Sequence, residues 1–331
     1  MRQILAKCGD KTKNAGPLGG VLLLENGKII QKSAPRFSSP EQMMRDAQKP
    51  TYAVIIPHFN DPDRLRRCLT ALMPQTGDDT EVIVADNGSS CDLSGLEADF
   101  PDVRIVVEPA SGAGLARNAG VAASTAPWLL FIDADCVPAP DWLAVGRRVA
   151  RPDTVIGGRV DVFDETPGPR SGAEAFETVF AFHMRDYFER KAFLGAGNLI
   201  LSREVFEATG GFRTGVSEDV EWSQRAASKG FELAFEDDFA AKHPSRSDWR
   251  ALSRKWRRLA SEEFQLRGAE ARGKWIAKGL AMPASVIAHI PKVLSHPALN
   301  GREKGRALVT LLRLRLMRMV WMLGQAATGR P

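Results

Sequence analysis

The sequence is poor in the residues and runs that mark several common protein classes. Its four cysteines, Cys8, Cys68, Cys91 and Cys136, are far apart and form no CxxC pair. This spacing excludes a disulfide framework and a cysteine-bound structural zinc, and it favours a reducing compartment. The first residues, MRQILAKCGDKTKN, contain no apolar core of the length that a signal peptide needs. We therefore expect a protein that is made and stays in the cytoplasm.

Long apolar runs are also missing, because none reaches the roughly 18 residues that a membrane-spanning helix requires. The two best candidates are residues 275–291 and 306–323. The first is interrupted by Lys278, Pro283, His289 and Pro291, and the second by Arg313, Arg315 and Arg318. Apolar helices that carry arginines are suited to lying at a lipid interface, where the long basic side chains reach the headgroups.

The net charge of +5 conceals a strong asymmetry along the chain. Residues 242–331 hold 19 lysines and arginines against 5 acidic residues, whereas residues 1–241 hold 26 against 35. A basic end on an acidic body indicates an anionic partner, such as a membrane surface, a phosphorylated lipid or nucleic acid. A solvated helical face is the simpler alternative.

The 331 residues divide by pattern into four segments. Asn26-Gly27 lies between two apolar runs, which predicts a hairpin within a small β unit, residues 1–32. Residues 33–50 are polar and hold three prolines, as is typical of a linker. Residues 51–245 form the main domain, and residues 246–331 form a basic, amphipathic helical region.

In the main domain, short apolar runs alternate with helical stretches. The runs are YAVIIP, EVIVAD, VRIVVE and WLLFIDAD, with helices expected at about 63–72 and 115–123. This alternation predicts an α/β domain with a parallel sheet that is buried on both faces. Ligands bind beyond the carboxyl ends of such strands. Asn60, Asp86, Asp133 and Asp135 all follow apolar runs and are therefore candidate site residues.

Asp133 and Asp135 end the run WLLFIDAD. In an extended segment, side chains at i and i+2 point the same way, so the two carboxylates repel unless a cation or donors compensate them. Aspartates that accept backbone hydrogen bonds in a turn are the simpler interpretation. In a crevice, however, such oxygen ligands suit Mg²⁺ or Mn²⁺ bridging a diphosphate.

The segment SGAGLARNAG superficially resembles a dinucleotide-binding fingerprint, but Arg117 replaces its third glycine. An NAD enzyme is therefore the least favoured interpretation. The glycines would let the backbone approach a ligand, and the helix that follows would present N–H groups to phosphate. A flexible loop before an alanine-rich helix explains the segment equally well.

The segment VSEDVEWSQRAASKG predicts a helix from Ser217 that stops at Gly230. Glu218 and Asp219 in its first turn either stabilise the helix dipole or supply a general base. His243 is a candidate for a metal shell. The tryptophans are expected to serve packing: Trp142, Trp222, Trp249 and Trp256.

Six segments in order resemble the motifs of family 2 glycosyltransferases with the GT-A fold, a Rossmann-like α/β fold. They are AVIIPHFN, EVIVADNGS, GAGLARNAG, LLFIDAD, GAGNLILSREVFEATGGF and SEDVEWSQRA, between residues 51 and 245. The resemblance implies that Asp86 contacts the nucleotide base, beside Pro57 to Asn60. It also implies roles for the following residues: Gly112, Gly114, Arg117 and Asn118 beside the donor, Asp133 at the ribose and metal, Asp135 at the metal, Gly197 and Asn198 on the acceptor side, Asp219 as catalytic base, and Glu218 in acceptor binding.

The implied activity is transfer of a sugar, with inversion, from a nucleotide-diphospho-sugar to an acceptor hydroxyl. We expect a UDP-sugar donor, Mn²⁺ or Mg²⁺ as cofactor, with Asp133, Asp135 and His243 as its ligands, and a glycan or polyprenyl-linked acceptor. The C-terminal region is expected to contact an anionic membrane at the inner face of the cell membrane, with no nucleic-acid partner. The QxxRW motif and transmembrane helices of processive synthases are absent, and RKWRRLA is only a loose echo of that motif. This favours the addition of one or a few sugars.

Two other functions remain open from the sequence. A sugar nucleotidyltransferase also binds nucleotide and metal in an α/β crevice, but it would leave the SED helix without a task. A noncatalytic membrane- or nucleic-acid-binding protein on the same scaffold fits the basic C-terminus, but it would have no need of both acidic pairs.

Overall fold

The computed structural model describes residues 20–25, 28–33, 50–214, 217–265 and 271–330. The chain divides into two compact units, residues 1–48 and 49–331. In the first unit, β1 (Gly20–Glu25) and β2 (Lys28–Ser33) pair antiparallel from Gly20↔Ser33 to Glu25↔Lys28. These are the strands of the predicted hairpin. The turn dipeptide Asn26-Gly27 and nearly all of the predicted linker lie outside the described residues.

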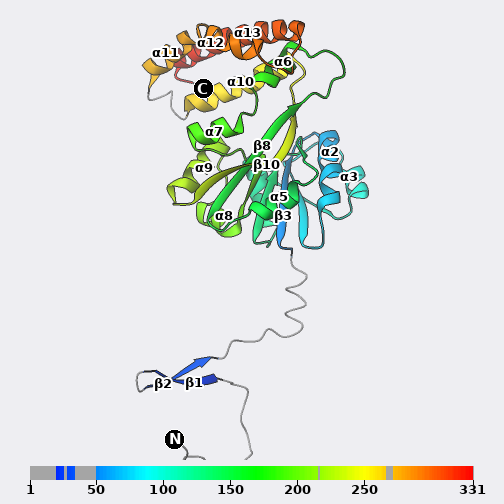
Figure 1. The fold of residues 1–331 in the computed structure, drawn as a ribbon, viewed down its shortest axis with the longest axis vertical. Helices are drawn as coiled ribbons and strands as arrows, with labels where there is room; N and C mark the ends of the chain where they lie inside the picture. Colours follow the sequence, from blue (N-terminus) through cyan, green and yellow to red (C-terminus); the bar gives the residue numbers. More distant parts are fainter. Residues whose placement is uncertain (1–19, 26–27, 34–49, 215–216, 266–270, 331) are drawn as a thin grey trace, which may run out of the picture. The chain divides into compact units, whose positions relative to one another are not determined.

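The second unit is built on one eight-stranded sheet with the strand order β5-β4-β3-β6-β9-β8-β10-β7 (Figure 1). Its strands are β3 (Tyr52–His58), β4 (Thr80–Asp86), β5 (Val103–Val107), β6 (Trp128–Ile132), β7 (Val137–Pro138), β8 (Thr154–Phe163), β9 (Asn198–Ser202) and β10 (Glu232–Pro244). The sheet is curled and has helices on both faces, which is the GT-A arrangement that the sequence predicts.

The sheet is mixed, so the prediction of a parallel sheet is correct except at β9 and β7; β8 and β10 also pair parallel with each other. Strands β3, β4, β5 and β6 are mutually parallel. β9, however, pairs antiparallel with both β6 and β8, and the two-residue β7 pairs antiparallel with β10. An apolar run such as NLILS is buried in either direction, and therefore its hydrophobicity carries no information on strand polarity.

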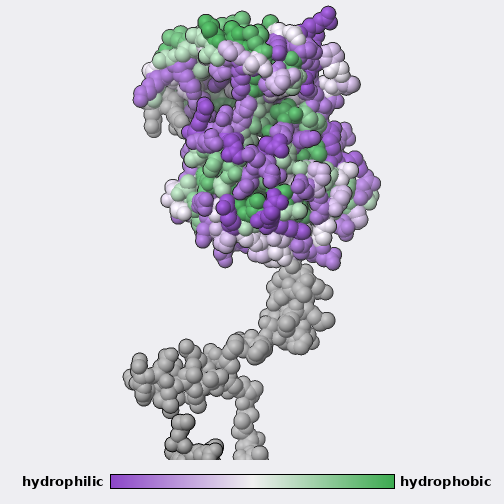
Figure 2. Space-filling model, viewed as in Figure 1, coloured by the Kyte–Doolittle hydropathy of each residue, from purple (hydrophilic) through white to green (hydrophobic). Residues whose placement is uncertain are grey.

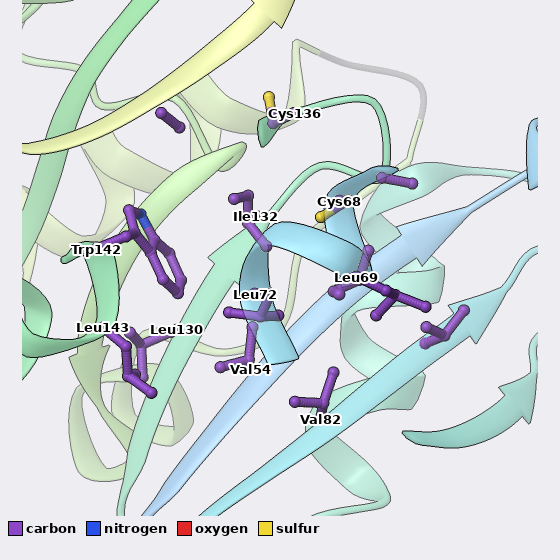
Figure 3. Close-up of a cluster of buried hydrophobic side chains, with 14 of the residues drawn as sticks. Val54, Cys68, Leu69, Leu72, Val82, Leu130, Ile132, Cys136, Trp142 and Leu143 are labelled. Atoms are coloured by element: carbon purple, nitrogen blue, oxygen red, sulfur yellow. The ribbon is translucent and has the colours of Figure 1, made fainter. Parts of the chain in front are cut away.

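Alternate side chains of the central strands enter two cores on opposite faces of the sheet. Val54 and Ile56 of β3 pack on one face, against α2 (Pro62–Leu72) and α5 (Trp142–Val149) (Figure 3). Ala53 and Ile55 pack on the other face. The helices there are α4 (Ala113–Ala122), α8 (Arg203–Thr209) and α9 (Glu218–Ser228). Burial of both faces by period-2 alternation explains the continuous apolar runs.

Most of the remaining helices form a layer beyond the carboxyl ends of β8 and β10 (Figure 1). Two apolar clusters join the helix after β8 to the helices after β10, and a third joins the helices after β10 to one another. The layer consists of α6 (Gly172–Phe180), α10 (Trp249–Glu263), α11 (Arg272–Ala281), α12 (Ser285–Leu294) and α13 (Gly301–Thr328). Of the other helices, α3 (Ser94–Asp99) packs Leu96 into the core with α2 and α5, and α7 (Met184–Lys191) packs Phe188 against the opposite core; a 3-10 turn lies at Met73–Gln75. None of the described helices is long and apolar enough to span a membrane.

The structure confirms two smaller expectations. Trp142 and Trp222 are fully buried, and Trp249 and Trp256 pack in the cluster between α6 and α13. The described cysteines, Cys68, Cys91 and Cys136, are free thiols. Cys8 lies outside the described residues.

Gly158 of β8 offers a test of the sheet packing. A Cβ at this position would overlap the backbone carbonyl of Phe239 and the amide of Asn198. We expect Gly158→Ala to lower the free energy of unfolding by about 2 kcal/mol or more, because the clash is with backbone. Gly305→Ala on α13 is the matched control: its Cβ meets nothing, and a helix gains roughly 0.5–1 kcal/mol from this change. Equal denaturation midpoints for the two variants would contradict this packing.

Candidate active site

Asp133, Ala134 and Asp135 leave β6 in a turn and not in an extended segment. The turn is closed by the Cys136 N–H, which donates to the Asp133 carbonyl at 2.9 Å. The expectation that both carboxylates point to one side as in a strand is therefore wrong. Asp133 pairs with Arg117, and Asp135 pairs with His243. The repulsion between the two aspartates is thus relieved by separate partners.

Arg117 of α4 is the centre of the acidic cluster. Its side chain is 4% exposed, and it donates from Nη2 to Asp133 Oδ1 at 2.6 Å and from Nη1 to Glu218 Oε1 at 2.5 Å. The guanidinium also lies over the ring of Phe212 at 5.6 Å. Burial opposes its charge, but the carboxylates of Asp133, Asp219 and Glu218 prevail and raise the pKa of Arg117.

Two predicted glycines let these carboxylates approach the backbone. The Gly114 N–H, in the first turn of α4, donates to Glu218 Oε2 at 2.9 Å, and a Cβ there would lie 2.8 Å from the same oxygen. A Cβ on Gly197 would overlap the Asp133 carboxylate. The anion at this helix N-terminus is therefore Glu218, which the helix dipole stabilises.

Asp219, the predicted base, adjoins this cluster. Its Oδ1 is enclosed and has no hydrogen-bond partner in the described part of the chain. Burial raises the pKa of Asp219 to about 6; the Arg117 charge lowers it, while the Glu218 and Asp133 charges add to the rise. A carboxylate with this pKa is ionised at neutral pH and is still basic enough to accept a proton.

His243, near the end of β10, faces Asp135, with Nε2 3.1 Å from Oδ2. Its Nδ1 lies 2.7 Å from the Pro244 carbonyl, which can only accept, so Nδ1 carries the proton. Nε2 is thereby directed at Asp135. Although burial opposes ionisation, the hydrogen bond and charge of His243 and the charges of Arg64 and Arg246 hold the pKa of Asp135 below its usual value.

The fit of this site to a divalent cation rests on Asp135 and His243. Within the described ranges, no three His, Cys, Asp or Glu side chains form a group that could hold a metal ion by themselves. Asp133, the third predicted ligand, is engaged by Arg117. One carboxylate and an imidazole whose Nδ1 is fixed by a carbonyl nevertheless suit an ion that takes its other ligands from substrate phosphates and water.

The predicted base pocket follows β3 and β4, whose carboxyl ends meet. Asp86 Oδ1 accepts from His58 Nδ1 at 2.9 Å and from Ser89 Oγ at 2.5 Å, and Oδ2 accepts from the Ser89 N–H at 2.9 Å. Burial opposes ionisation of Asp86, but these bonds lower its pKa. Asn60, at φ 51°, accepts through Oδ1 from the Ser90 N–H at 2.8 Å. The two loops are therefore held together before any ligand binds.

Several predicted site residues hydrogen-bond within the fold. Asn118 bonds both backbone groups of Phe212, and Gly112 donates its N–H to Asn87 at 2.7 Å. Asn198 is 2% exposed; it accepts from Trp142 Nε1 and donates to the carbonyls of Arg159 and Phe239. Pro57 pairs with Ala85 within the sheet. In this structure these side chains position the loops around the acidic cluster.

A pocket of about 480 Å³ adjoins Asp135 and His243, and sequence reasoning did not foresee it. Its basic lining comes from α2, from the loop after β10 and from α10: Arg64, Arg246, Arg254, Lys255 and Arg258. The dense positive charge of residues 246–258 was a signal for it, but nothing in the sequence placed Arg64 beside them. His58 was likewise missed as the partner of Asp86.

Comparison with known proteins gives the family. Residues 53–210 match the model of Glycosyl transferase family 2. Residues 53–210 are therefore a family 2 glycosyltransferase domain, as the order of the motifs predicts.

Relatives of known name agree with this assignment. Glycosyltransferase AglE of Haloferax volcanii is 26% identical over 291 residues, which span 82% of this chain and 92% of that protein. The succinoglycan biosynthesis protein ExoO of Rhizobium meliloti is 32% identical over 116 residues, 34% of this chain and 32% of ExoO. Among solved structures, the mannosyltransferase PcManGT from Pyrobaculum calidifontis, in complex with GDP-Man and Mn²⁺, aligns with a TM-score of 0.48 and 20% identity, covering 86% of this chain and 76% of that chain.

The raised pKa of Asp219 predicts a pH-dependent stability. Between the unfolded pKa near 3.8 and the folded pKa of about 6, the folded state keeps a proton that the unfolded state loses, so stability falls as pH rises through this window. Asp219→Asn removes the free-energy cost of ionising this buried carboxylate. We expect it to raise the free energy of unfolding at pH 7.5 by on the order of 2 kcal/mol, and by much less at pH 4.5. Urea denaturation at both pH values measures this, and an equal gain at both would contradict the assignment.

Proposed function

We propose that this glycosyltransferase is metal-dependent and inverting, and that it moves a sugar from a nucleotide-diphospho-sugar to a hydroxyl of a lipid-linked or polysaccharide acceptor. A UDP-sugar is the favoured donor, and cell-surface or exopolysaccharide biosynthesis the favoured setting, which agrees with the name of the relative ExoO. The observation that carries the proposal is Asp219, an enclosed carboxylate with a pKa of about 6 beside the Arg117 cluster. The reaction of a nucleotidyltransferase would give the Asp219 carboxylate no role.

On the donor side, Asp86 and the Asn60 loop would receive the base, and Asp133 the ribose. Asp135 and His243 would hold Mn²⁺ or Mg²⁺, which when bound supplies positive charge beside the donor diphosphate. The support for these roles is the preformed hydrogen-bond network at Asp86 and the orientation of His243 Nε2.

On the acceptor side, Asp219 takes the proton of the acceptor hydroxyl. The acceptor oxygen then forms its bond to the anomeric carbon while the bond from that carbon to the diphosphate oxygen breaks on the opposite face, so the configuration inverts. Arg117 keeps Glu218 in place at the start of α9, which fixes the position of the neighbouring Asp219. Gly197 borders the same cluster at Asp133, and Asn198, which follows it, is the first residue of β9.

Turnover tests the catalytic assignment. With Mn²⁺ and a panel of UDP- and GDP-sugars, we expect Asp219→Asn to reduce kcat by about 10²–10⁴-fold, because the general base is lost. Asp135→Ala should raise the Mn²⁺ concentration needed for half-maximal rate. The wild-type rate should increase with pH through about 6. Asp238→Asn, on an 81% exposed side chain of β10, is the control. Full activity of Asp219→Asn would refute the role of this residue.

We further propose that the helical layer contacts an anionic membrane surface. Large apolar side chains are exposed on it, and apolar residues gather over α11 to α13 in Figure 2. They are Ile276, Leu280, Ile287, Leu294, Val309, Leu312, Leu316, Met317 and Val320. Exposed basic side chains on the same helices, among them Lys274, Lys292 and Arg313, would meet anionic headgroups.

Vesicle binding tests this surface. Leu312→Glu/Leu316→Glu places two acids one turn apart on α13, where the native side chains are 46% and 41% exposed. We expect the change to weaken binding to phosphatidylglycerol vesicles by about tenfold or more, because apolar contact is lost and like charge repels. Val107→Glu, at a 68% exposed residue of β5, is the matched control. Equal sedimentation of both variants with vesicles would refute the proposed surface.

A further inference from the structure

The basic pocket lies between the sheet and the helical layer. One wall is the end of β10 and the loop after it, His243 to Ser247, and the other is α10. α10 is amphipathic: Leu252 and Trp256 pack against the apolar cluster of α6 and α13, whereas Arg254, Lys255 and Arg258 line the pocket. The helix therefore joins the helical layer to the catalytic cleft and turns its basic side toward Asp135.

A buried carboxylate pairs with two of the cations that line this pocket. Glu177 of α6 is 1% exposed and pairs with Arg246 Nη1 at 3.0 Å and with Lys255 Nζ at 2.9 Å. One buried carboxylate thus orders two cations, and both retain further N–H donors. Arg254, on the next turn of α10 from Arg258, has no ion-pair partner among the residues that the structure describes.

Phe182 connects the two walls. The centroid of its ring lies 4.4 Å from the centroid of the His243 ring. The same centroid lies 4.6 Å from Lys255 Nζ. Phe182 has a φ of 52°, a left-handed conformation that is uncommon for an aromatic residue. Such strain persists only where the surroundings enforce it, which indicates a preformed pocket.

The position of the pocket bears on whether its anionic ligand is the diphosphate of the donor or a phosphate of the acceptor. The predicted base pocket, Asp86 with His58, follows β3 and β4 on one side of β6. This pocket takes most of its lining from β10, the loop after it and α10, on the other side of β6 in the sheet order, and of the described residues only Arg64 of α2 reaches it from the β3 side. A divalent ion at Asp135 would already compensate the charge of the donor diphosphate. The arginines of α10, which belong to the helical layer, are therefore left for a second anion.

We propose that this pocket binds a phosphate or diphosphate group of the acceptor, so that the acceptor is a phosphorylated lipid and not a neutral glycan. The proposal rests on the proposed glycosyltransferase function for its acceptor. Arg254 and Arg258 supply charge-assisted hydrogen bonds to the phosphate oxygens, beside Arg246 and Lys255. The phosphate end of the acceptor thereby docks under α10, near the cleft that holds Asp219.

The test uses the full chain and farnesyl phosphate, a short polyprenyl phosphate, with EDTA present to exclude the metal site. Calorimetric titration should detect binding of farnesyl phosphate and much weaker binding of farnesol. Arg254→Gln/Arg258→Gln should weaken farnesyl phosphate binding by about tenfold or more, because two charged donors are lost. Arg257→Gln is the matched control, since it makes the same change on the same helix outside the pocket lining.

Measurement of UDP binding with Mn²⁺ decides whether the pocket serves the donor diphosphate or the acceptor phosphate. It should stay within about twofold of wild type in the double variant, because the donor does not use these arginines. An equal loss of UDP binding would assign the pocket to the donor diphosphate and overturn the proposal. Equal affinity for farnesol and farnesyl phosphate, or an equal effect of Arg257→Gln, would also overturn it. Failure of the glycosyltransferase proposal is a separate result, seen as absence of sugar transfer while phosphate binding persists.

Discussion

The buried guanidinium of Arg117 is the constraint on which the site depends. A buried arginine is costly unless its charge is compensated, and here Asp133 and Glu218 provide the direct partners. These two carboxylates come from segments about 85 residues apart in sequence, so Arg117 holds the end of β6 against the start of α9. The close approach requires glycine at positions 114 and 197. The geometry of the cluster therefore follows from one cation.

The same cluster sets the electrostatics of Asp219. Three carboxylates surround a single arginine, and the third, Asp219, has an oxygen with no hydrogen-bond partner among the described residues. With the positive charge already shared by two closer anions, burial outweighs the attraction of Arg117, and the pKa of Asp219 rises. Asp135, outside this cluster, has its own partner in His243, and its pKa falls. Environment thus shifts the pKa of Asp135 down and that of Asp219 up, so that Asp219 can accept a proton near neutral pH.

Local patterns made part of this arrangement predictable. The strands end where their apolar runs end, and α9 begins after Ser217, because burial and helix termini depend on neighbouring residues. The partners of the charged residues were only partly predictable, since they lie far apart in the chain. Asp135 and His243 are expected together at one metal site, but nothing in the sequence pairs Arg117 with Glu218 or Glu177 with Lys255. The turn at Asp133 to Asp135 was missed for a similar reason. The alternation rule holds only inside a strand, and the strand ends at Ile132.

The mixed sheet gives the cleft two chemically distinct sides. β6 has the parallel β3 on one side and the antiparallel β9 on the other. The parallel side brings together the loops after β3 and β4, which form a neutral and acidic hydrogen-bonding pocket around Asp86. The antiparallel β9 instead spaces β6 from β8 and β10, whose carboxyl ends lead into α6 and α10. The basic side chains of α10 and the buried Glu177 of α6 thereby meet on the far side of Asp135. The reversal of β9 thus separates the side that holds Asp86 from a basic side continuous with the exposed apolar helices.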